Sequence, residues 1–460
     1  MSFTRGYPTS VLWSAHADHT TALTVAGCGF FAAAAALALF APPQFWQLLA
    51  GTAALAVVFL VFRHTVACSV IWLLVAGATL EMTLIDLVGP TAFQTTIAVV
   101  KAAELGLAVV CVLRYGPALD VFNPALGFLA MFLAGLAHGL YPSLSTLDSL
   151  RSLAGSVAPF AFAFSRLSRR WSQNIINAIC WVPIVSVVGG GALDLAGLRP
   201  IFFESGGERL AGLGHPAFLG GLCLTAIYAC LIELYRDGKS RSLILLAVNA
   251  LLLVLTGARA PLGYAVIVTG LTLAFLRSAA LPPRCRILPL LLAAALLPLM
   301  IILASQLSSI RLFNVLSNEA GNLSGRNLLW PPFREAAAAS PWFGWGVGAG
   351  NAIIPPSSEL ARMTQTWAAH NEYLRMAVEG GELGRLLLIG LFVLWAVRHI
   401  TVLRRTDRII MRLVFIAFAA HAYTDNVLIS TTACVFFAFV TAVFARGVLE
   451  REAGVTGGAK

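Results

Sequence analysis

The sequence predicts an all-α integral membrane protein: a polytopic bundle of about 12–14 transmembrane helices, with a large polar loop that contains short helices. Two observations lead to this prediction. Hydrophobic residues make up 59% of the 460 residues and charged residues only 11%, whereas an ordinary soluble domain has about 25% charged residues. Apolar runs also recur from residue 22 to residue 448, and roughly 20 apolar residues are enough to cross a bilayer core. The chain therefore has no room for a large soluble domain.

The apolar runs give the expected spans directly. They are residues 22–40, 46–62, 67–85, 95–113, 122–137, 150–165, 173–189, 214–235, 242–256, 261–277, 287–305, 380–397, 409–424 and 431–448. The chain is thus divided into N-terminal transmembrane helices (1–305), a large polar loop (306–379) and C-terminal transmembrane helices with a tail (380–460). A protein made mostly of lipid-facing helix needs polar residues and water for chemistry, so the segment around this loop is the expected site.

Basic residues predict the orientation. They cluster in short links such as 166–170, 236–241, 277–286 and 398–412, and such clusters stay on the cytoplasmic side of a membrane. The N- and C-termini are then cytoplasmic, and the loop 306–379 lies on the outer face, which is periplasmic in a Gram-negative cell. The same placement explains the formal charge of +10 without a nucleic-acid partner. The eight cysteines are scattered without metal-ligand spacing, so we expect them to pack between helices.

Two arginines break the charge pattern. Arg259 joins two apolar runs and Arg326 lies in the outer loop, where the positive-inside bias would not place an idle arginine. Guanidinium groups pair bidentately with phosphate oxygens, which points to a phosphate or pyrophosphate ligand at the outer face. A salt bridge to a local carboxylate such as Glu335, or contact with lipid headgroups, is the alternative.

His370 is the candidate general base. It precedes Asn371, and helical spacing places Tyr373 close to its face. Nearby arginines disfavour the charged imidazole, so a neutral ring able to accept a proton is expected. Such a ring suits a base or an acceptor that orients a hydroxyl group. A histidine at the start of a helix can also be purely structural.

Several motifs in order resemble the signature of the O-antigen ligase family. That family shares a superfamily with O-antigen polymerases and bacterial protein O-oligosaccharyltransferases. The motifs are Glu208–Pro216, Thr256–Arg259, Ser324–Trp330, Pro341 with Gly344-Trp-Gly346, and His370-Asn371 followed after nine residues by Gly381-x-x-Gly384. Ala258 replaces a common serine and Arg385 a common threonine or valine, and neither departure removes a candidate catalytic group.

The resemblance implies a metal-independent, inverting glycosyltransferase of the bacterial inner membrane that uses no cofactor. Its donor would be a glycan on undecaprenyl pyrophosphate and its acceptor a sugar hydroxyl of lipid A–core, as in lipopolysaccharide biosynthesis. The expected catalytic residues are His370, Arg259 and Arg326, with the arginines on the pyrophosphate. No acidic pair suited to a divalent cation stands in the outer segments, so arginines are fit to balance the pyrophosphate charge.

The remaining substrate-binding candidates lie beside these motifs or within apolar runs. They are Asn371, Arg209, Tyr373, Trp330, Lys101 and Arg151. Tryptophans can stack on sugar rings, although a row of tryptophans at a membrane surface is also typical of an interfacial belt. Lys101 and Arg151 are candidates for the lipid-phosphate cavity. The alternative for Lys101 is an ion pair with Glu104, three residues further along one helix face.

The sequence is also compatible with two other functions. A polymerase or a protein O-oligosaccharyltransferase would have the same donor site and a different acceptor cleft. A secondary transporter that couples transport through Lys101 and Glu104 belongs to a different class. The absence of evident inverted repeats and the concentration of motifs in an outer loop disfavour the transporter.

Overall fold

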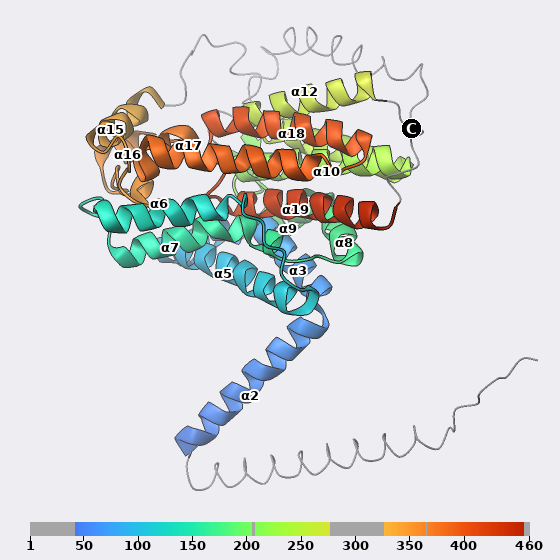
Figure 1. The fold of residues 1–460 in the computed structure, drawn as a ribbon, viewed down its shortest axis with the longest axis horizontal. Helices are drawn as coiled ribbons and strands as arrows, with labels where there is room; N and C mark the ends of the chain where they lie inside the picture. The colour runs from blue at the N-terminus through green and yellow to red at the C-terminus, as the bar shows by residue number, and fades with distance from the viewer. Residues whose placement is uncertain (1–41, 205–207, 277–325, 365, 455–460) are drawn as a thin grey trace, which may run out of the picture. The chain divides into compact units, whose positions relative to one another are not determined.

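The computed structural model describes residues 42–204, 208–276, 326–364 and 366–454, which are almost entirely helical (Figure 1). The chain forms two compact units, residues 1–64 and residues 65–460. Helix α2 (Pro42–Arg63) is the described element of the first unit. The second unit holds α3 (Thr65–Ala78), α4 (Leu80–Val88), α5 (Pro90–Tyr115), α6 (Ala125–His138), α7 (Thr146–Val157), η1 (Ala158–Phe164), α8 (Arg169–Ile179), α9 (Val182–Leu195), α10 (Pro216–Asp237), α11 (Ser240–Leu255), α12 (Arg259–Phe275), α15 (Arg326–Ala339), η3 (Ala349–Asn351), α16 (Glu359–Thr364), α17 (Glu372–Ile400), α18 (Arg405–Thr424) and α19 (Thr431–Glu452).

The all-α membrane fold is confirmed in the described part of the chain. Four of its helices are long and apolar enough to cross a membrane, or up to six if each of two bent helix pairs forms one span. Among the described residues, the strands form one two-stranded antiparallel sheet, β1 (Phe202–Glu204) with β2 (Glu208–Leu210). The expected spans 22–40 and 287–305 lie outside the described residues.

Three expected spans are each split into two elements. The run 67–85 divides into α3 and α4 at Thr79, whose φ is 48°. The runs 150–165 and 173–189 divide where a proline begins a new element, Pro159 in η1 and Pro183 in α9. Proline lacks a backbone N–H and fixes φ, so it fits the first turn of a helix and interrupts a continuous one. As a result α8 and α9 are bent by 48°.

Helices α10 and α19 form the centre of the second unit. Of their apolar windows, 83% and 78% of the residues are buried, against 33% for α5 and 28% for α17. The outward faces of α5 and α17 carry exposed apolar side chains such as Val109, Leu386 and Val393. Because a lipid environment accepts such side chains, these two helices have the composition of lipid-facing spans.

An ion-pair network ties together the far ends of three helices. Arg236 at the end of α10 binds Asp407 at the start of α18, with 3.0 Å between Nη1 and Oδ2. Arg236 and Arg404 both pair with Glu450 near the end of α19. Since α19 runs from residue 431 to residue 452, this network lies at the end of the bundle away from the turn between α18 and α19.

A break in α17 docks the polar loop onto the bundle. Gly381 has φ 58° and ψ −165° inside the helix, one residue after the predicted start of the span 380–397. The carbonyls of residues 378 and 379 accept the N–H groups of Trp345 and Gly346 at 2.9 Å, and the N–H groups of residues 382 and 383 donate to the carbonyls of residues 341 and 342. The loop thus satisfies the backbone groups that the break releases.

Candidate functional site

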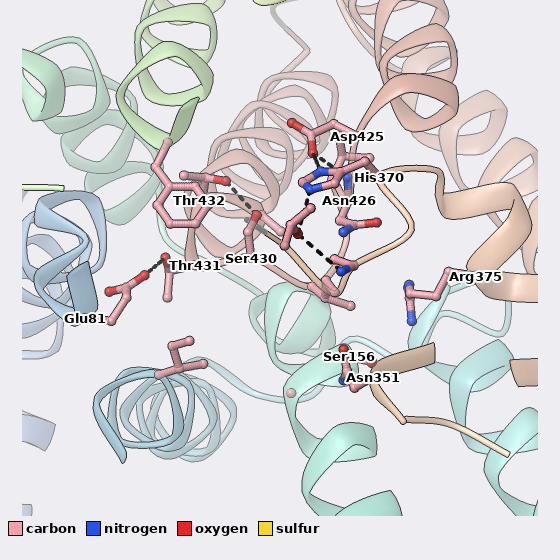
Figure 2. A pocket seen from close by; sticks show the side chains of 18 of the residues that line it. Glu81, Ser156, Asn351, His370, Arg375, Asp425, Asn426, Ser430, Thr431 and Thr432 are labelled. Carbon is pink, nitrogen blue, oxygen red and sulfur yellow. Dashed lines mark hydrogen bonds and ion pairs between the residues drawn. The ribbon is translucent and has the colours of Figure 1, made fainter. Parts of the chain in front are cut away.

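The centre of the candidate site is an imidazole–carboxylate pair. His370 Nδ1 lies 2.9 Å from Oδ1 of Asp425. His370 precedes α17, and Asp425 caps the C-terminal end of α18. The two residues are 55 positions apart in the sequence, so the helix packing alone brings them together. Figure 2 shows both side chains at the wall of the cavity described below.

The backbone around His370 is strained and held on both sides. His370 has φ 47°, one of two described non-glycine residues with positive φ, a conformation that costs on the order of 1–3 kcal/mol. On one side Trp330 Nε1 donates to the carbonyl of Ala369 at 2.9 Å. On the other, the side-chain oxygen of Asn371 accepts the N–H of Leu374 at 3.1 Å and caps α17. These contacts fix the direction in which the imidazole points.

A small apolar core packs next to the backbone of His370. Buried side chains of α15, η3, α16, α17 and the segments that connect them pack together in it: Leu329, Phe333, Ala349, Ile354, Ala361, Ala369 and Val378. Ala369 immediately precedes His370, so its packing against α15 and α16 helps to fix the backbone position of His370. In Figure 1 these elements gather at one end of the bundle beside the start of α17.

Asp425 is ionised at every physiological pH. Burial by itself raises the pKa of its carboxyl group, but the hydrogen bond and charge of His370, the charge of His421 and the N–H of Asn426 together lower the pKa to about 2. An ionised carboxylate can only accept hydrogen bonds. A His370 ring with a single N–H therefore carries that hydrogen on Nδ1, which faces the carboxylate, and Nε2 carries the lone pair.

Nε2 of His370 faces a hydroxyl group in the structure. Thr366 Oγ1 lies 3.1 Å from Nε2, and with the hydrogen on Nδ1 the hydroxyl of Thr366 is the donor. The same oxygen accepts the N–H of Ala368. The ring nitrogen that a general base uses is thus accessible to an alcohol at hydrogen-bond distance.

Arg326 reaches the same point from α15. Its Nη2 donates to the carbonyl of Thr424 at 2.6 Å, one residue before Asp425. The C-terminal end of a helix carries partial negative charge and unpaired carbonyls, so a guanidinium group is stabilised there. Within the described ranges Arg326 forms no salt bridge with a carboxylate. Its remaining N–H groups are donors available to an anionic ligand.

One large cavity of about 1850 Å³ contains these groups. Its walls come from α4, α5, α7, α10 and α15, from the loop before α17, and from the turn between α18 and α19, and apolar atoms contribute more of the wall than polar atoms. Among the charged and titratable residues that line it are Lys101, Arg151, Arg209, Arg326, His370 and Asp425. A mixed wall of this kind accepts a ligand with both an apolar and an anionic part.

Lys101 lines the cavity without the ion pair that the sequence suggested. Its Nζ donates to the carbonyl of Gly155 at 3.0 Å and to that of Ile429 at 2.7 Å. The Glu104 carboxylate is fully buried, and neither of its oxygens has a hydrogen-bond partner in the described part of the chain. The tertiary structure thus directs the ammonium group of Lys101 across to other helices.

The other predicted arginines take different positions. Arg209 is buried, lines the cavity and donates from Nε to the carbonyl of Thr256 at 2.9 Å. Arg259, three residues after Thr256, is exposed at the start of α12 and is not part of the cavity wall. Helix α12 nevertheless reaches the site, because the ring of Tyr264 lies 5.3 Å from that of His421.

Three further predicted residues surround the site without lining the cavity. Asn371 is the helix cap and Trp330 the support of Ala369, as described above. Tyr373 donates from its hydroxyl to the carbonyl of Ala419 at 2.9 Å, which ties α17 to α18. Arg151 does line the cavity, at its exposed edge, where Nη1 pairs with Oδ1 of Asp148 at 3.1 Å.

Asp425 is the residue that the sequence reasoning did not assign to the site. The sequence suggested that arginines surround His370, whereas its charged partner is this carboxylate. The available signal was a carboxylate at the end of an apolar run, where an unpaired charge is costly. The sequence did not indicate that Asp425 pairs with His370, because the two residues are 55 positions apart in the chain.

Together these features define a multi-pass helical membrane protein whose cavity brings an imidazole–carboxylate pair and basic side chains together. Residues 243–389 match the model of the O-antigen ligase family. The family identified from the sequence motifs is therefore confirmed. The matched region includes Arg259, Arg326 and His370 and ends before Asp425. Members of the family are membrane glycosyltransferase-like enzymes, either ligases or polymerases. No curated protein matches the chain.

Proposed function

We propose that the protein is an O-antigen ligase that transfers a glycan from undecaprenyl pyrophosphate to a sugar hydroxyl of lipid A–core. The observation that carries this proposal is the His370–Asp425 pair, which faces the same cavity as Arg326. A general base can take the proton of an attacking alcohol, and a nearby guanidinium group can stabilise a diphosphate that leaves the donor sugar.

The reaction uses the lone pair on His370 Nε2. This nitrogen takes the proton of the acceptor hydroxyl as its oxygen bonds to the anomeric carbon of the donor. The bond from that carbon to the diphosphate oxygen breaks, and its electron pair leaves with the diphosphate. Attack opposite the leaving group inverts the anomeric carbon. Asp425 stabilises the imidazolium that forms, as the carboxylate of a catalytic triad does.

The leaving diphosphate gains negative charge, so the cations around the cavity matter. We assign Arg326 and Arg259 to the diphosphate, with Arg209 and Lys101 as further donors. Arg326 and Lys101 support this because both line the cavity, and neither forms a salt bridge among the described residues. Two of the three N–H groups of Lys101 bind carbonyls, which leaves one for a ligand.

The cavity end of the bundle is proposed to face the periplasm of a bacterial inner membrane. The support is the arginine-rich opposite end, where Arg236, Arg404 and Arg446 gather with their carboxylate partners. Positive residues favour the cytoplasmic side. The N- and C-termini are then cytoplasmic. The apolar share of the cavity wall would accept the lipid part of the donor, with membrane lipids around the bundle.

An O-antigen polymerase is the second candidate, because the matched family contains ligases and polymerases alike. A protein O-oligosaccharyltransferase would require the same donor chemistry. These reactions differ in the acceptor alone, so the acceptor has to be identified by experiment.

The test is reconstitution of the purified protein with a lipid-linked glycan and one acceptor at a time. Transfer to lipid A–core is the expected outcome. Glycan chains that lengthen on the donor lipid would instead identify a polymerase, and transfer to a pilin-like protein an oligosaccharyltransferase. His370→Ala should abolish the transfer while the variant remains in the membrane. Full activity of His370→Ala would remove the base assignment.

A further inference from the structure

Glu372 is a fully buried carboxylate at the first position of α17, two residues after His370. Both of its oxygens have partners. Oε2 accepts from Nε of Arg375 at 2.5 Å, and Oε1 accepts the backbone N–H of Leu428 at 2.8 Å. The second bond leaves α17 and reaches a different part of the chain. The residue therefore does more than pair with its helical neighbour.

The N–H that Glu372 binds belongs to the turn that carries Asp425. This turn connects the end of α18 at Thr424 with the start of α19 at Thr431, and Leu428 lies three residues after Asp425. Helix α17, which starts next to His370, is thus hydrogen-bonded to the turn that carries Asp425, the carboxylate partner of His370. The His370–Asp425 contact and the Glu372–Leu428 contact are two parallel connections between the same two segments.

Arg375 offsets the cost of burying this carboxylate. Its Nη1 also binds Oε2 of Glu379 at 2.7 Å, so one guanidinium group lies between two glutamates on successive turns of α17. Glu379 and Glu372 are buried to the same extent, at 1% and 0% exposed, and both pair with Arg375. Glu372 differs in its bond to the backbone of the turn. Substitutions of the two glutamates can therefore be compared directly, since both side chains are buried and bind Arg375.

We propose that Glu372 is a positioning residue, which holds the turn 425–430 against the start of α17 and so keeps the Asp425 carboxylate on Nδ1 of His370. The inference rests on the proposed role of His370 as general base. Glu372 acts through the turn and touches no substrate. Its effect on the reaction arises because a displacement of about 1 Å in a catalytic group can reduce a rate roughly 10²-fold.

Two substitutions separate positioning from simple ion pairing. Glu372→Gln keeps the side-chain length and an oxygen for the N–H of Leu428 but loses the charge that faces Arg375. Glu372→Asp keeps the charge and is shorter by one methylene, so it does not reach Leu428. If Glu372 positions the turn, Glu372→Gln should have a higher kcat than Glu372→Asp. If Glu372 serves only its ion pair with Arg375, Glu372→Asp should have the higher kcat. Glu379→Gln and Glu379→Asp are the matched controls for the ring signal alone, because Glu379 itself lines the cavity.

The first measurement is independent of activity. Protein labelled with 15N-histidine in lipid nanodiscs, with the His370 signals assigned through His370→Gln, should give the Nδ1–H form of the ring in the wild type. Glu372→Gln should keep this signal and Glu372→Asp should lose it, while both Glu379 variants keep it. The second measurement is the steady-state transfer rate. Glu372→Asp should reduce kcat by roughly 10- to 100-fold and leave the donor KM within about twofold.

The outcomes decide the two proposals separately. If Glu372→Asp keeps the ring signal and kcat while Glu372→Gln loses them, the carboxylate serves only its ion pair and the inference is overturned. Failure of both Glu372 variants to fold would also make the role structural and overturn it. If the wild type transfers no glycan, the proposed function fails, and the ring signals still establish whether Glu372 holds the turn.

Discussion

Asp425 Oδ1 lies 2.9 Å from Nδ1 of His370, and this contact fixes which ring nitrogen meets a substrate. With the carboxylate ionised, Nε2 has the lone pair. Asp425→Asn replaces one acceptor oxygen with an amide that donates hydrogen bonds, which favours the wrong form of the ring. We expect kcat to fall at least about 10²-fold, the usual contribution of a general base.

The control for Asp425→Asn is Asp237→Asn. Asp237 lies at the far end of α10, where it pairs with Lys239, so its loss should leave kcat within the error of the transfer assay. Wild-type kcat in Asp425→Asn would show that the pair has no part in the reaction.

The pH dependence of stability follows from the lowered pKa of Asp425. A carboxyl group with a pKa near 3.9 in the unfolded chain and about 2 in the folded protein stabilises the fold fully above the unfolded value. This stabilisation is lost as the pH falls toward 2. The stabilising difference in thermal midpoint between the wild type and Asp425→Asn should thus be present at about pH 5 and shrink below about pH 4. A difference that stays unchanged down to about pH 2 would contradict the assignment.

Arg326 should resist replacement by lysine. Its planar guanidinium group binds the carbonyl of Thr424 and has further N–H groups to offer an anion, whereas the ammonium of lysine is a point charge without this fork. We expect Arg326→Lys and Arg326→Ala both to reduce kcat/KM by about 10²-fold or more. Arg334→Ala on the same helix removes an exposed arginine that stacks on Trp330 and is the control. Transfer by Arg326→Lys at the wild-type rate would argue against a bidentate contact.

Trp330 has two possible roles, and Trp330→Phe separates them. Phenylalanine keeps an aromatic face for sugar stacking but loses the N–H that binds the carbonyl of Ala369. Because this bond supports the strained backbone of His370, we expect a loss of about 1 kcal/mol in the free energy of unfolding, together with a lower kcat. An unchanged thermal midpoint and kcat would favour the stacking role.

Gly381 should not tolerate alanine. A Cβ atom there would meet the carbonyl carbon of Trp342 at 2.3 Å, and φ is 58°. We expect Gly381→Ala to lower the free energy of unfolding by more than about 2 kcal/mol, measured by thermal unfolding in detergent. Gly390→Ala is the control on the same helix, since nothing lies within 4 Å of its Cβ position. Equal midpoints for the two variants would contradict the docking of the loop on α17.

The sequence predicted the helices well because the length and apolar character of a span are local properties. The expected runs 95–113 and 431–448 correspond to α5 (Pro90–Tyr115) and α19 (Thr431–Glu452), and both helices extend a few residues beyond the apolar run. The motifs also placed His370 and Arg326 in one site, and both line the cavity. Arg259 as a catalytic residue stays a prediction.

What the sequence could not determine are the contacts between distant segments. The three-residue spacing of Lys101 and Glu104 suggested an ion pair, but the ammonium group binds the carbonyls of Gly155 and Ile429. The partner of His370 comes from a different helix, 55 residues away. Membrane length and helix propensity decide where each helix begins and ends, whereas the choice of partner depends on which helix ends pack together. That choice belongs to the tertiary structure, because buried charges and hydrogen-bonding groups must find partners wherever the packing places them.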